Sequence, residues 1–498
     1  MLYKSTRSTA PATRSGAEVI KEGLAPDGGL YVPESIPTLT LPEIEALCKM
    51  SYPERAADIL GRFLTDYTHE ELLEDCATAY NREHFVGGVA PLIGLRTDYP
   101  MAILELWHGP TAAFKDMALQ IMPRLLSRAL VKTGEKKDAL ILVATSGDTG
   151  KAALEGYRDV DRVRILVFYP SEGVSPVQKL QMATQQGSNV AVCGIRGNFD
   201  DAQSGVKTIL NSPEMITRAR VRGILFSSAN SINWGRLAPQ IVYYVSAYCD
   251  LINSGKCKPG SRFNICVPTG NFGNIFAAYL TKRMGLPIEK LICASNANNV
   301  LTDFLRTGTY DRNRTFHMTM SPSMDILVSS NLERLLYVIA GSEKTAGWMQ
   351  DLKDTGRYTV DIETLREIQK TFCGYCTSEE ETAETIRRTW RDGNYLADPH
   401  TAVAIHAAKA YMGENADRNP MVVDSTASPF KFAADVYRAL TGGDPISDMD
   451  ALDQLSSLTK SKIPYPLAGL AKRPIRFSQV CEVSEMRNVV MDFVKKKK

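Results

Sequence analysis

The chain has 498 residues, of which 44% are hydrophobic and 23% are charged, a balance that is typical of globular proteins and excludes a wholly disordered chain. Its length corresponds to about three domains. The 58 lysines and arginines nearly match the 56 aspartates and glutamates, so the net charge of +2 provides no large field for binding nucleic acid or an acidic membrane surface.

Short apolar segments alternate with longer amphipathic segments from about residue 100 onward. Before residue 95, Pro and Gly interrupt the helical stretches, and turn residues gather in GLAPDGGLYVPE at 23–34. Many intervals between the apolar segments have helical spacing, which predicts an α/β protein with mainly parallel sheets covered on both faces. The predicted strands are Ala102–Leu106, Ala139–Ala144, Val163–Tyr169, Asn189–Gly194, Gly223–Phe226, Arg262–Val267, Leu291–Ala294 and Met421–Val423.

Changes in the succession of apolar and amphipathic segments divide the chain into four parts. Residues 1–95 are predicted to form an N-terminal domain, and residues 96–302 an α/β core of two subdomains with the site between them. Residues 303–395 have no regular succession of strands and are predicted to be a mostly helical insertion or a separate helical lobe. Residues 396–498 return to the core.

The ten cysteines are scattered, and several lie in apolar runs, which is typical of reduced thiols in a cytosolic protein. The close pair Cys373 and Cys376 has no second pair for a zinc site, and no His/Asp/Glu cluster has metal-ligand spacing, so we predict no metal. Apolar runs are far shorter than the about 18 residues of a membrane span. The first residues, MLYKSTRSTAPATRS, contain no secretory apolar region, so a cytoplasmic location is expected.

Ligands of open parallel sheets bind where strands end and helices begin, and four such segments are unusual here. The first is WHGPTAAFKD at 107–116, where a helix is expected to begin near Thr111 and to carry Lys115 in its first turns. The positive end of the helix dipole should lower the pKa of this lysine, as a Schiff-base lysine requires. The alternative is a surface lysine paired with Asp116.

The second segment is ATSGDTGK at 144–151, between a predicted strand and a predicted helix. Its backbone N–H groups and the following helix suit an anion. It is not a phosphate-binding P-loop, because Thr145 stands where Gly is required and Ala152 follows Lys151. The alternative is an ordinary polar turn.

The third segment, PTGNFGN at 268–274, contains two glycines that let the backbone approach a ligand closely. N–H groups at the following helix start form a good phosphate cradle. The spacing differs from G-x-G-x-x-G, which disfavours a nicotinamide cofactor, and a plain turn is the alternative. The fourth segment, DSTASPFK at 424–431, places hydroxyls at a strand end, where they can bond a heterocycle, but is weak by itself.

Together and in this order, the four segments resemble the threonine synthase family, in its longer type with an N-terminal domain of its own. HGPTAAFKD is similar to the family's lysine segment, and TGNFGN to its loop for the cofactor phosphate. STR at 5–7, DGGLYVPE and SSANSINWGRLAPQ at 227–240 are also similar to family motifs. The resemblance implies a fold-type II (tryptophan synthase β-like) enzyme that uses pyridoxal 5′-phosphate.

The resemblance also implies a reaction and a set of site residues. The reaction converts O-phospho-L-homoserine and water into L-threonine and phosphate by γ-elimination and β-addition of water. Lys115 would bind the cofactor aldehyde and act as general base, and Thr426 would bond the pyridine nitrogen. The cofactor phosphate would be held by Gly270, Asn271, Phe272, Gly273 and Asn274. The substrate carboxylate would be held by Thr145, Ser146, Gly147, Asp148 and Thr149, and the substrate phosphate by Lys151, Ser231, Asn233 and Arg236.

Several points stay open at this stage. Asp148 is expected to bind through its backbone, because its charge repels a carboxylate. Ser428 stands where many relatives have His, and Asn274 where some have Asp. Another fold-type II lyase, which would release phosphate, a 2-keto acid and ammonia, remains an alternative, as does a non-catalytic binding protein. A monomer or homodimer without nucleic-acid or membrane partners is expected.

Overall fold

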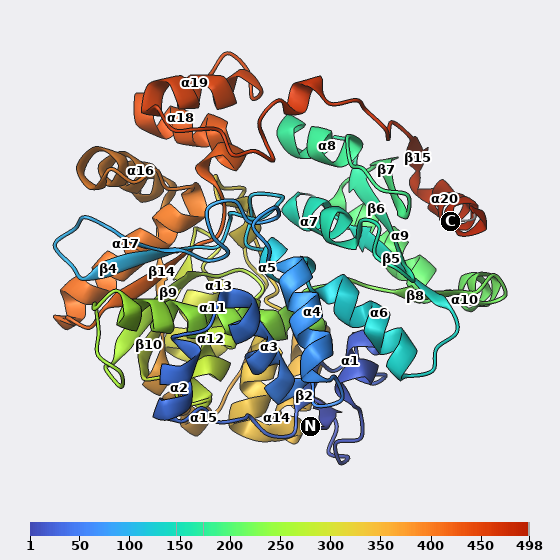
Figure 1. Cartoon of the computed structure of the whole chain (residues 1–498), viewed down its shortest axis with the longest axis horizontal. Coiled ribbons are helices and arrows are strands. Elements are labelled where there is room, and N and C mark those ends of the chain that lie inside the picture. The colour runs from blue at the N-terminus through green and yellow to red at the C-terminus, as the bar shows by residue number, and fades with distance from the viewer. Residues whose placement is uncertain (146, 173, 497–498) are drawn as a thin grey trace.

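The structure, a computed structural model, describes residues 1–145, 147–172 and 174–496. Two β-sheets form its framework (Figure 1), and we call them the large and the small sheet. The large sheet has the strand order β13-β10-β9-β14-β4-β3, and every pairing in it is parallel except that of β3 with β4. Its strands are β3 (Leu92–Gly94), β4 (Met101–Glu105), β9 (Phe263–Pro268), β10 (Ile288–Ser295), β13 (Phe372–Cys376) and β14 (Met421–Ser425).

The small sheet is entirely parallel, with the order β15-β7-β6-β5-β8. Its strands are β5 (Asp138–Ala144), β6 (Val163–Pro170), β7 (Val190–Arg196), β8 (Ile224–Ser227) and β15 (Val480–Glu482). All eight strands that the sequence predicts are therefore present, and the prediction of mainly parallel sheets is confirmed. The two-stranded sheets pair β1 (Tyr3–Ser5) with β2 (Tyr31–Pro33) and β11 (Thr309–Asp311) with β12 (Arg357–Thr359).

Residues 303–395 are mostly helical, but they also supply β13, which lies at an edge of the large sheet beside β10. This segment is thus joined to the core rather than separate from it. The sequence FCGYC did not stand out because Gly374, a poor strand former, interrupts it. Cys373 and Cys376 belong to this strand.

Helices cover both faces of the sheets. Before β5 they are α1 (Gly16–Glu22), α2 (Leu41–Leu47), α3 (Tyr52–Phe63), α4 (His69–Ala79), α5 (Asp116–Leu119) and α6 (Met122–Lys132). From β5 to β10 they are α7 (Asp148–Tyr157), α8 (Pro176–Ala183), α9 (Phe199–Leu210), α10 (Pro213–Arg220), α11 (Trp234–Asn253) and α12 (Gly273–Arg283). The later helices are α13 (Val300–Thr307), α14 (Leu332–Thr355), α15 (Ile362–Thr371), α16 (Glu379–Gly393), α17 (Pro399–Asn415), α18 (Ala433–Thr441), α19 (Asp450–Thr459) and α20 (Met486–Lys495). Four short 3₁₀ helices are η1 (Pro322–Met324), η2 (Pro429–Phe432), η3 (Leu470–Lys472) and η4 (Val483–Glu485).

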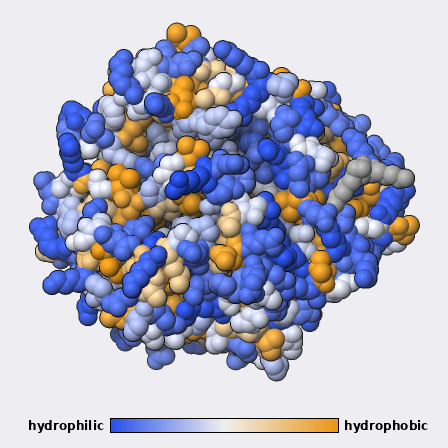
Figure 2. Space-filling view, in the orientation of Figure 1, coloured by the Kyte–Doolittle hydropathy of each residue, from blue (hydrophilic) through white to orange (hydrophobic). Residues whose placement is uncertain are grey.

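Helix α11 is the central helix and is buried along nearly its whole length. It is apolar on all sides because it packs against α3, α5 and α12 from different directions. Among the helices of the described residues, none combines the length and the apolar character needed to cross a membrane. Figure 2 shows a mostly hydrophilic surface on which apolar residues form small, separate groups.

The chain passes between the two sheets three times. Strands β3 and β4 enter the large sheet, β5 to β8 build the small sheet, β9, β10, β13 and β14 return to the large one, and β15 closes the edge of the small one. Figure 1 shows the last crossing as an extended segment that leads from α19 to β15 and α20. The loops that follow β4, β5, β9 and β14 consequently meet between the sheets.

Candidate active site

A cavity of about 860 Å³, here called the lysine cavity, lies between the two sheets and is lined by parts of all four segments. The predicted site residues that line it are Lys115, Thr145, Gly147, Asp148, Thr149, Ser231, Asn233, Arg236, Gly270, Asn271, Gly273, Asn274 and Thr426. Ser146 lies outside the described residues. The side chain of Phe272 instead packs in the core against Phe372, with 5.7 Å between ring centroids.

Lys115 is placed by strand-like pairing between two loops. The Phe114 N–H donates to the Thr426 carbonyl at 2.8 Å, and the Ser428 N–H donates to the Ala112 carbonyl at 3.1 Å. This pairing ties the lysine segment to the hydroxyl segment. It also explains why α5 begins only after Lys115 and not near Thr111, as the sequence suggested: residues 112–114 take part in the bridge.

The pKa of Lys115 is lowered, as predicted from the sequence, but the cause is different. Burial, which disfavours the charged ammonium, is the largest cause, and Asp148 opposes it from 3.9 Å. A helix of four residues that starts after the lysine contributes little dipole. The predicted alternative, a surface lysine paired with Asp116, is wrong, because the Asp116 carboxylate accepts the N–H and hydroxyl of Thr111 at 2.8 and 2.7 Å.

The carboxylate of Asp148 forms an ion pair that the sequence analysis missed. Lys431 Nζ lies 2.6 Å from Asp148 Oδ1, and the exposed fractions of the two side chains are 0% and 3%. Gln178 also donates to this carboxylate at 2.9 Å. Burial alone would raise the pKa of Asp148, but Lys431 and then Lys115 outweigh it and lower the pKa. The sequence analysis expected the charge of Asp148 to repel a substrate carboxylate, and this ion pair offsets that charge.

The loop before α7 is organised by one hydroxyl. Thr145 Oγ1 accepts the N–H groups of Gly147 and Gly150 at 3.1 and 3.0 Å, so this side chain holds the loop rather than a ligand. The N–H groups of the first helical turn have no carbonyl partner within α7. The loop thus leads directly into a helix start, which is the kind of element for which the sequence predicts an anion site.

The glycine loop before α12 is tightly packed. A Cβ atom on Gly270 would lie 2.7 Å from the Ser323 carbonyl, so only glycine fits here. Phe272 has a φ of +61° and turns the chain into α12, which begins at Gly273. Asn274 turns its amide toward the Pro268 carbonyl at 3.3 Å. The loop therefore presents backbone rather than side chains, which suits a phosphate.

Two of the four residues predicted for the substrate phosphate have other partners. Lys151 pairs with Glu155 at 3.0 Å and lines a different cavity, so the geometry does not support its predicted role at the substrate phosphate. Asn233 caps α11, since its side chain accepts the Gly235 N–H and donates to the Ile20 carbonyl, both at 2.9 Å. This residue borders the lysine cavity while both amide atoms are engaged.

Arg236 remains available for an anion. Its side chain is 5% exposed and donates to the Ala229 carbonyl at 2.6 Å, while its Nε has no partner among the described residues. Burial lowers the pKa of Arg236 to about 10, so the guanidinium keeps its charge at neutral pH. Ser231 lines the same cavity.

His400 lines the lysine cavity, although the sequence gave no motif around it. Its Nε2 accepts the Ser323 N–H at 3.1 Å, and its Nδ1 lies 2.8 Å from Asp398. The ring therefore positions the loop that packs on Gly270. Ser428, at the position that many relatives fill with His, and His108 line the other cavity.

Three family models match the chain: "Threonine synthase N terminus" over residues 2–80, "Pyridoxal-phosphate dependent enzyme" over 98–424, and "Threonine synthase, C-terminal" over 401–490. The chain is 41% identical to the threonine synthase of Pseudomonas aeruginosa over 89% of this chain and 92% of that one. It is also 41% identical to human threonine synthase-like 1 over 85% of this chain, but it spans only 58% of that protein.

The solved structure of a pyridoxal-phosphate-bound threonine synthase from Brucella melitensis is similar over the full length of both chains, with a TM-score of 0.88 and 37% identity. The matching models, the identities and this structural similarity agree with the geometry of the lysine cavity. The chain belongs to the threonine synthase family of pyridoxal-phosphate-dependent lyases.

Proposed function

We propose that this chain converts O-phospho-L-homoserine and water into L-threonine and phosphate, by γ-elimination of phosphate and addition of water at Cβ. The observation that carries the proposal is the lysine cavity, where Lys115 faces the glycine loop and the anion loop before α7. One end of the substrate is a carboxylate and the other a phosphate, so a cavity with two anion-binding regions around a lysine matches it.

The residues present fit pyridoxal 5′-phosphate, the cofactor of the family. Gly270 and Gly273 add no side chain to the loop, and the first N–H groups of α12 are available for the cofactor phosphate. The hydroxyl of Thr426 would bond the pyridine nitrogen, and Lys115 would bind the aldehyde. When bound, the cofactor supplies an electron sink that makes the substrate Cα–H acidic.

Lys115 would move the protons of the reaction. An amine with a lowered pKa is neutral in a larger fraction of molecules at pH 7, so Nζ can take the proton from Cα and return one later in the reaction. Asp148, 3.9 Å away, holds the ammonium form once it has been made. Lys431 keeps Asp148 ionised for this purpose.

The substrate would lie between the α7 loop and Arg236. Backbone N–H groups from Gly147 to Thr149 would bind the carboxylate, and Arg236 Nε, which has no partner among the described residues, would bind the departing phosphate. Enclosure between the sheets strengthens these charge interactions and limits the water that enters.

The proposal is tested by incubating the purified protein with O-phosphohomoserine and measuring phosphate, threonine, 2-ketobutyrate and ammonia together. Equal amounts of phosphate and threonine are expected. Phosphate with 2-ketobutyrate and ammonia in place of threonine would contradict the proposal and favour the alternative lyase. Arg236→Gln should raise KM for the substrate at unchanged cofactor content, whereas the exposed Arg222→Gln should leave KM unchanged.

We further propose a cytoplasmic monomer or homodimer that does not bind nucleic acid. The ten cysteines are unpaired in the structure, including Cys193 and Cys481, whose sulfur atoms lie only 3.6 Å apart. Two thiols this close together stay reduced in a reducing compartment such as the cytoplasm, which is why we propose this location. Cell fractionation tests the location, and light scattering of the purified protein tests the oligomeric state.

A further inference from the structure

We propose that a second cavity, separate from the lysine cavity, is a binding site for an aromatic anion, meaning a flat ring that carries a phosphate or a carboxylate. This second cavity has a volume of about 1100 Å³ and lies between the loop after β4, helices α5 to α7 and the segment 461–474. A volume of this size accommodates a small organic molecule. The described residues that line the two cavities do not overlap.

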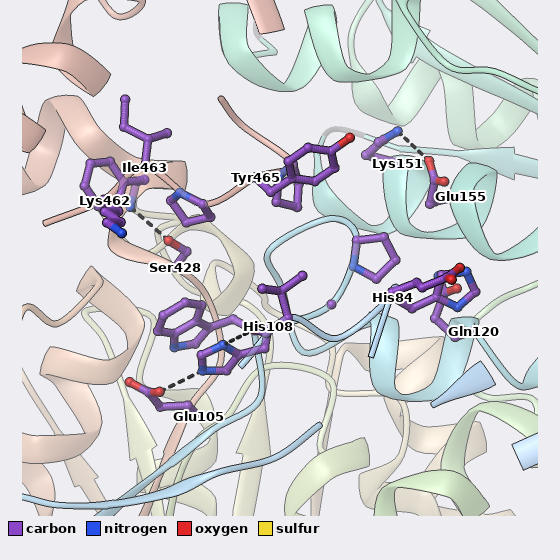
Figure 3. A pocket seen from close by; sticks show the side chains of 18 of the residues that line it. His84, Glu105, His108, Gln120, Lys151, Glu155, Ser428, Lys462, Ile463 and Tyr465 are labelled. Atoms are coloured by element: carbon purple, nitrogen blue, oxygen red, sulfur yellow. Dashed lines mark hydrogen bonds and ion pairs between the residues drawn. The ribbon is translucent and has the colours of Figure 1, made fainter. Parts of the chain in front are cut away.

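Figure 3 shows how the labelled side chains surround the space. Gln120 and His84 lie on one side, and His108 with Glu105 lies on the other. The Lys151–Glu155 pair and Tyr465 border it from the small-sheet side and the C-terminal segment. The cavity is therefore walled by side chains from distant parts of the chain.

Two donors on one wall have no acceptor among the described residues: Nε2 of Gln120 and Nε of Arg124. Gln120 is only 5% exposed and directly follows α5, and Arg124 lies four positions later, in the first turn of α6. Enclosed donors without acceptors are costly and uncommon in native proteins. An anionic group bound beside Gln120 and Arg124 would provide the acceptor that both donors lack.

The charges of the lining favour an anion. Glu105 is engaged by His108 at 2.8 Å, and Glu155 by Lys151 and Arg158 at 3.0 and 2.9 Å. Arg473, in contrast, donates only to backbone carbonyls at 3.3 Å in the described part of the chain. The remaining charged or titratable lining residues are Glu83, His84, Asp159 and Lys462. Glu105 and Glu155 thus each have a partner within the protein, while Arg473 has no carboxylate partner among the described residues.

The opposite wall favours a flat ring. Trp107 and His108 are stacked on each other with 4.3 Å between ring centroids and 15° between planes, and both line the cavity. Further aromatic lining residues are Trp390, Tyr395, Phe430 and Tyr465. Aromatic faces bind planar apolar groups by stacking. A ring against these residues and an anionic group near Arg124 together define the ligand class.

Ligand binding at this site touches the elements that hold Lys115. Pro110 faces the second cavity and Lys115 the lysine cavity, within one loop. Helix α7 likewise presents Lys151 to one cavity and Asp148 to the other. An occupant of the second cavity is therefore in a position to shift the lysine cavity by moving these shared elements.

The test uses the cofactor-loaded full chain and phenyl phosphate as the probe, with benzoate and inorganic phosphate in parallel, by titration calorimetry. Saturable binding of phenyl phosphate or benzoate is expected, and Arg124→Met and Gln120→Leu should each weaken it about tenfold, the loss of one hydrogen bond to a charged group. Arg128→Met is the matched control: it lies one turn further along α6, where it pairs with Asp75 at 2.6 Å. The visible absorbance of the bound cofactor reports that each variant is folded.

Because the lysine cavity can also take a phosphate, the same titrations are made with Arg236→Gln. Binding that is lost in this variant and kept in Arg124→Met would overturn the proposal, and so would the absence of saturable binding in the wild type. Inorganic phosphate that binds as tightly as phenyl phosphate would overturn the assignment of a ring. A difference between phenyl phosphate and benzoate identifies which anionic group the site takes. Threonine formation is not needed for any of these outcomes.

Discussion

At the scale of single residues, the surroundings of Lys115 determine its chemistry. The loop pairing with Thr426 fixes its backbone, burial lowers its pKa, and Asp148 stays within 3.9 Å of its ammonium group. These three effects come from three different parts of the chain. A lysine with the same neighbours in sequence but without this fold would be an ordinary surface cation.

Replacing Lys115 should therefore remove both a covalent link and a base. In Lys115→Ala we expect the visible absorbance of the lysine-linked cofactor to disappear and threonine formation to fall by about 10²- to 10⁴-fold or more. Lys344→Ala, which removes a lysine that is 52% exposed and pairs with Asp361, is the control and should behave as the wild type. Unchanged absorbance in Lys115→Ala would contradict the assignment.

The sequence pointed to Lys115 and the two glycine-containing loops because their residue types are unusual at strand ends. It did not point to Lys431, although this residue lies at the end of the fourth segment, because its role depends on a carboxylate 283 positions earlier. His400 was missed for the same reason, since its partner Ser323 belongs to a distant loop. Conversely, the sequence could not show that Lys151 lines a different cavity from Lys115, because the direction of a side chain at a helix start depends on where the helix begins.

At the scale of elements, the loop from 268 to 274 has no room for a side chain at Gly270. Gly270→Ala places a Cβ atom 2.7 Å from the Ser323 carbonyl, and such overpacking costs about 1–3 kcal/mol. We expect the affinity for pyridoxal phosphate to fall about tenfold or more, measured by titration of the cofactor-free protein. Gly347→Ala is the control, because an added Cβ meets no atom within 4 Å there. Equal cofactor affinity in the two variants would contradict the proposal that this loop binds the cofactor phosphate.

The C-terminal elements complete the small sheet: β15 is its edge strand, and α20 packs in the apolar cluster on one of its faces. Met486, which is 1% exposed, packs in the cluster that covers one face of this sheet. Met486→Ala should lower the free energy of unfolding by about 2–5 kcal/mol, the usual cost of such a cavity, in a denaturant titration. Met318→Ala, at a residue that is 90% exposed, should cost almost nothing. A similar loss in both variants would contradict this role of α20.

The eight predicted strands were recognisable because buried parallel strands are nearly continuous apolar runs. Strands β13 and β15 escaped prediction because they lie at sheet edges, where half of the side chains need not be apolar, and β15 is in addition only three residues long. Pairing order was beyond the sequence as well. Nothing local in residues 480–482 shows that they pair with β7, almost 300 positions earlier.

At the scale of the whole molecule, the ion pair of Lys431 and Asp148 joins the two sheets. Lys431 follows β14 of the large sheet, whereas Asp148 begins α7, which follows β5 of the small sheet. Removing one partner leaves a buried charge alone, so Lys431→Met should cost about 3–5 kcal/mol of unfolding free energy. The double variant Lys431→Met with Asp148→Asn should regain a substantial part, and no recovery would contradict the coupling.

The same pair predicts a dependence on pH. The pKa of Asp148 is lower in the folded chain than the about 3.9 of an unfolded aspartate. Its contribution is therefore fully present above about pH 4 and is lost as the pH falls below that value. The difference in unfolding free energy between the wild type and Asp148→Asn should shrink in urea titrations made at decreasing pH; a constant difference would argue against this origin.

The late position of β15 and α20 has a consequence for synthesis on the ribosome. The four other strands of the small sheet are translated between residues 138 and 227, together with α9 and α10 of the apolar cluster on one of its faces. Helix α20, which completes this cluster, emerges more than 250 residues afterwards, so part of the cluster stays exposed on the nascent chain until then. We therefore expect cells that make this polypeptide to depend on chaperones that bind the exposed apolar surface of the incomplete small sheet during translation.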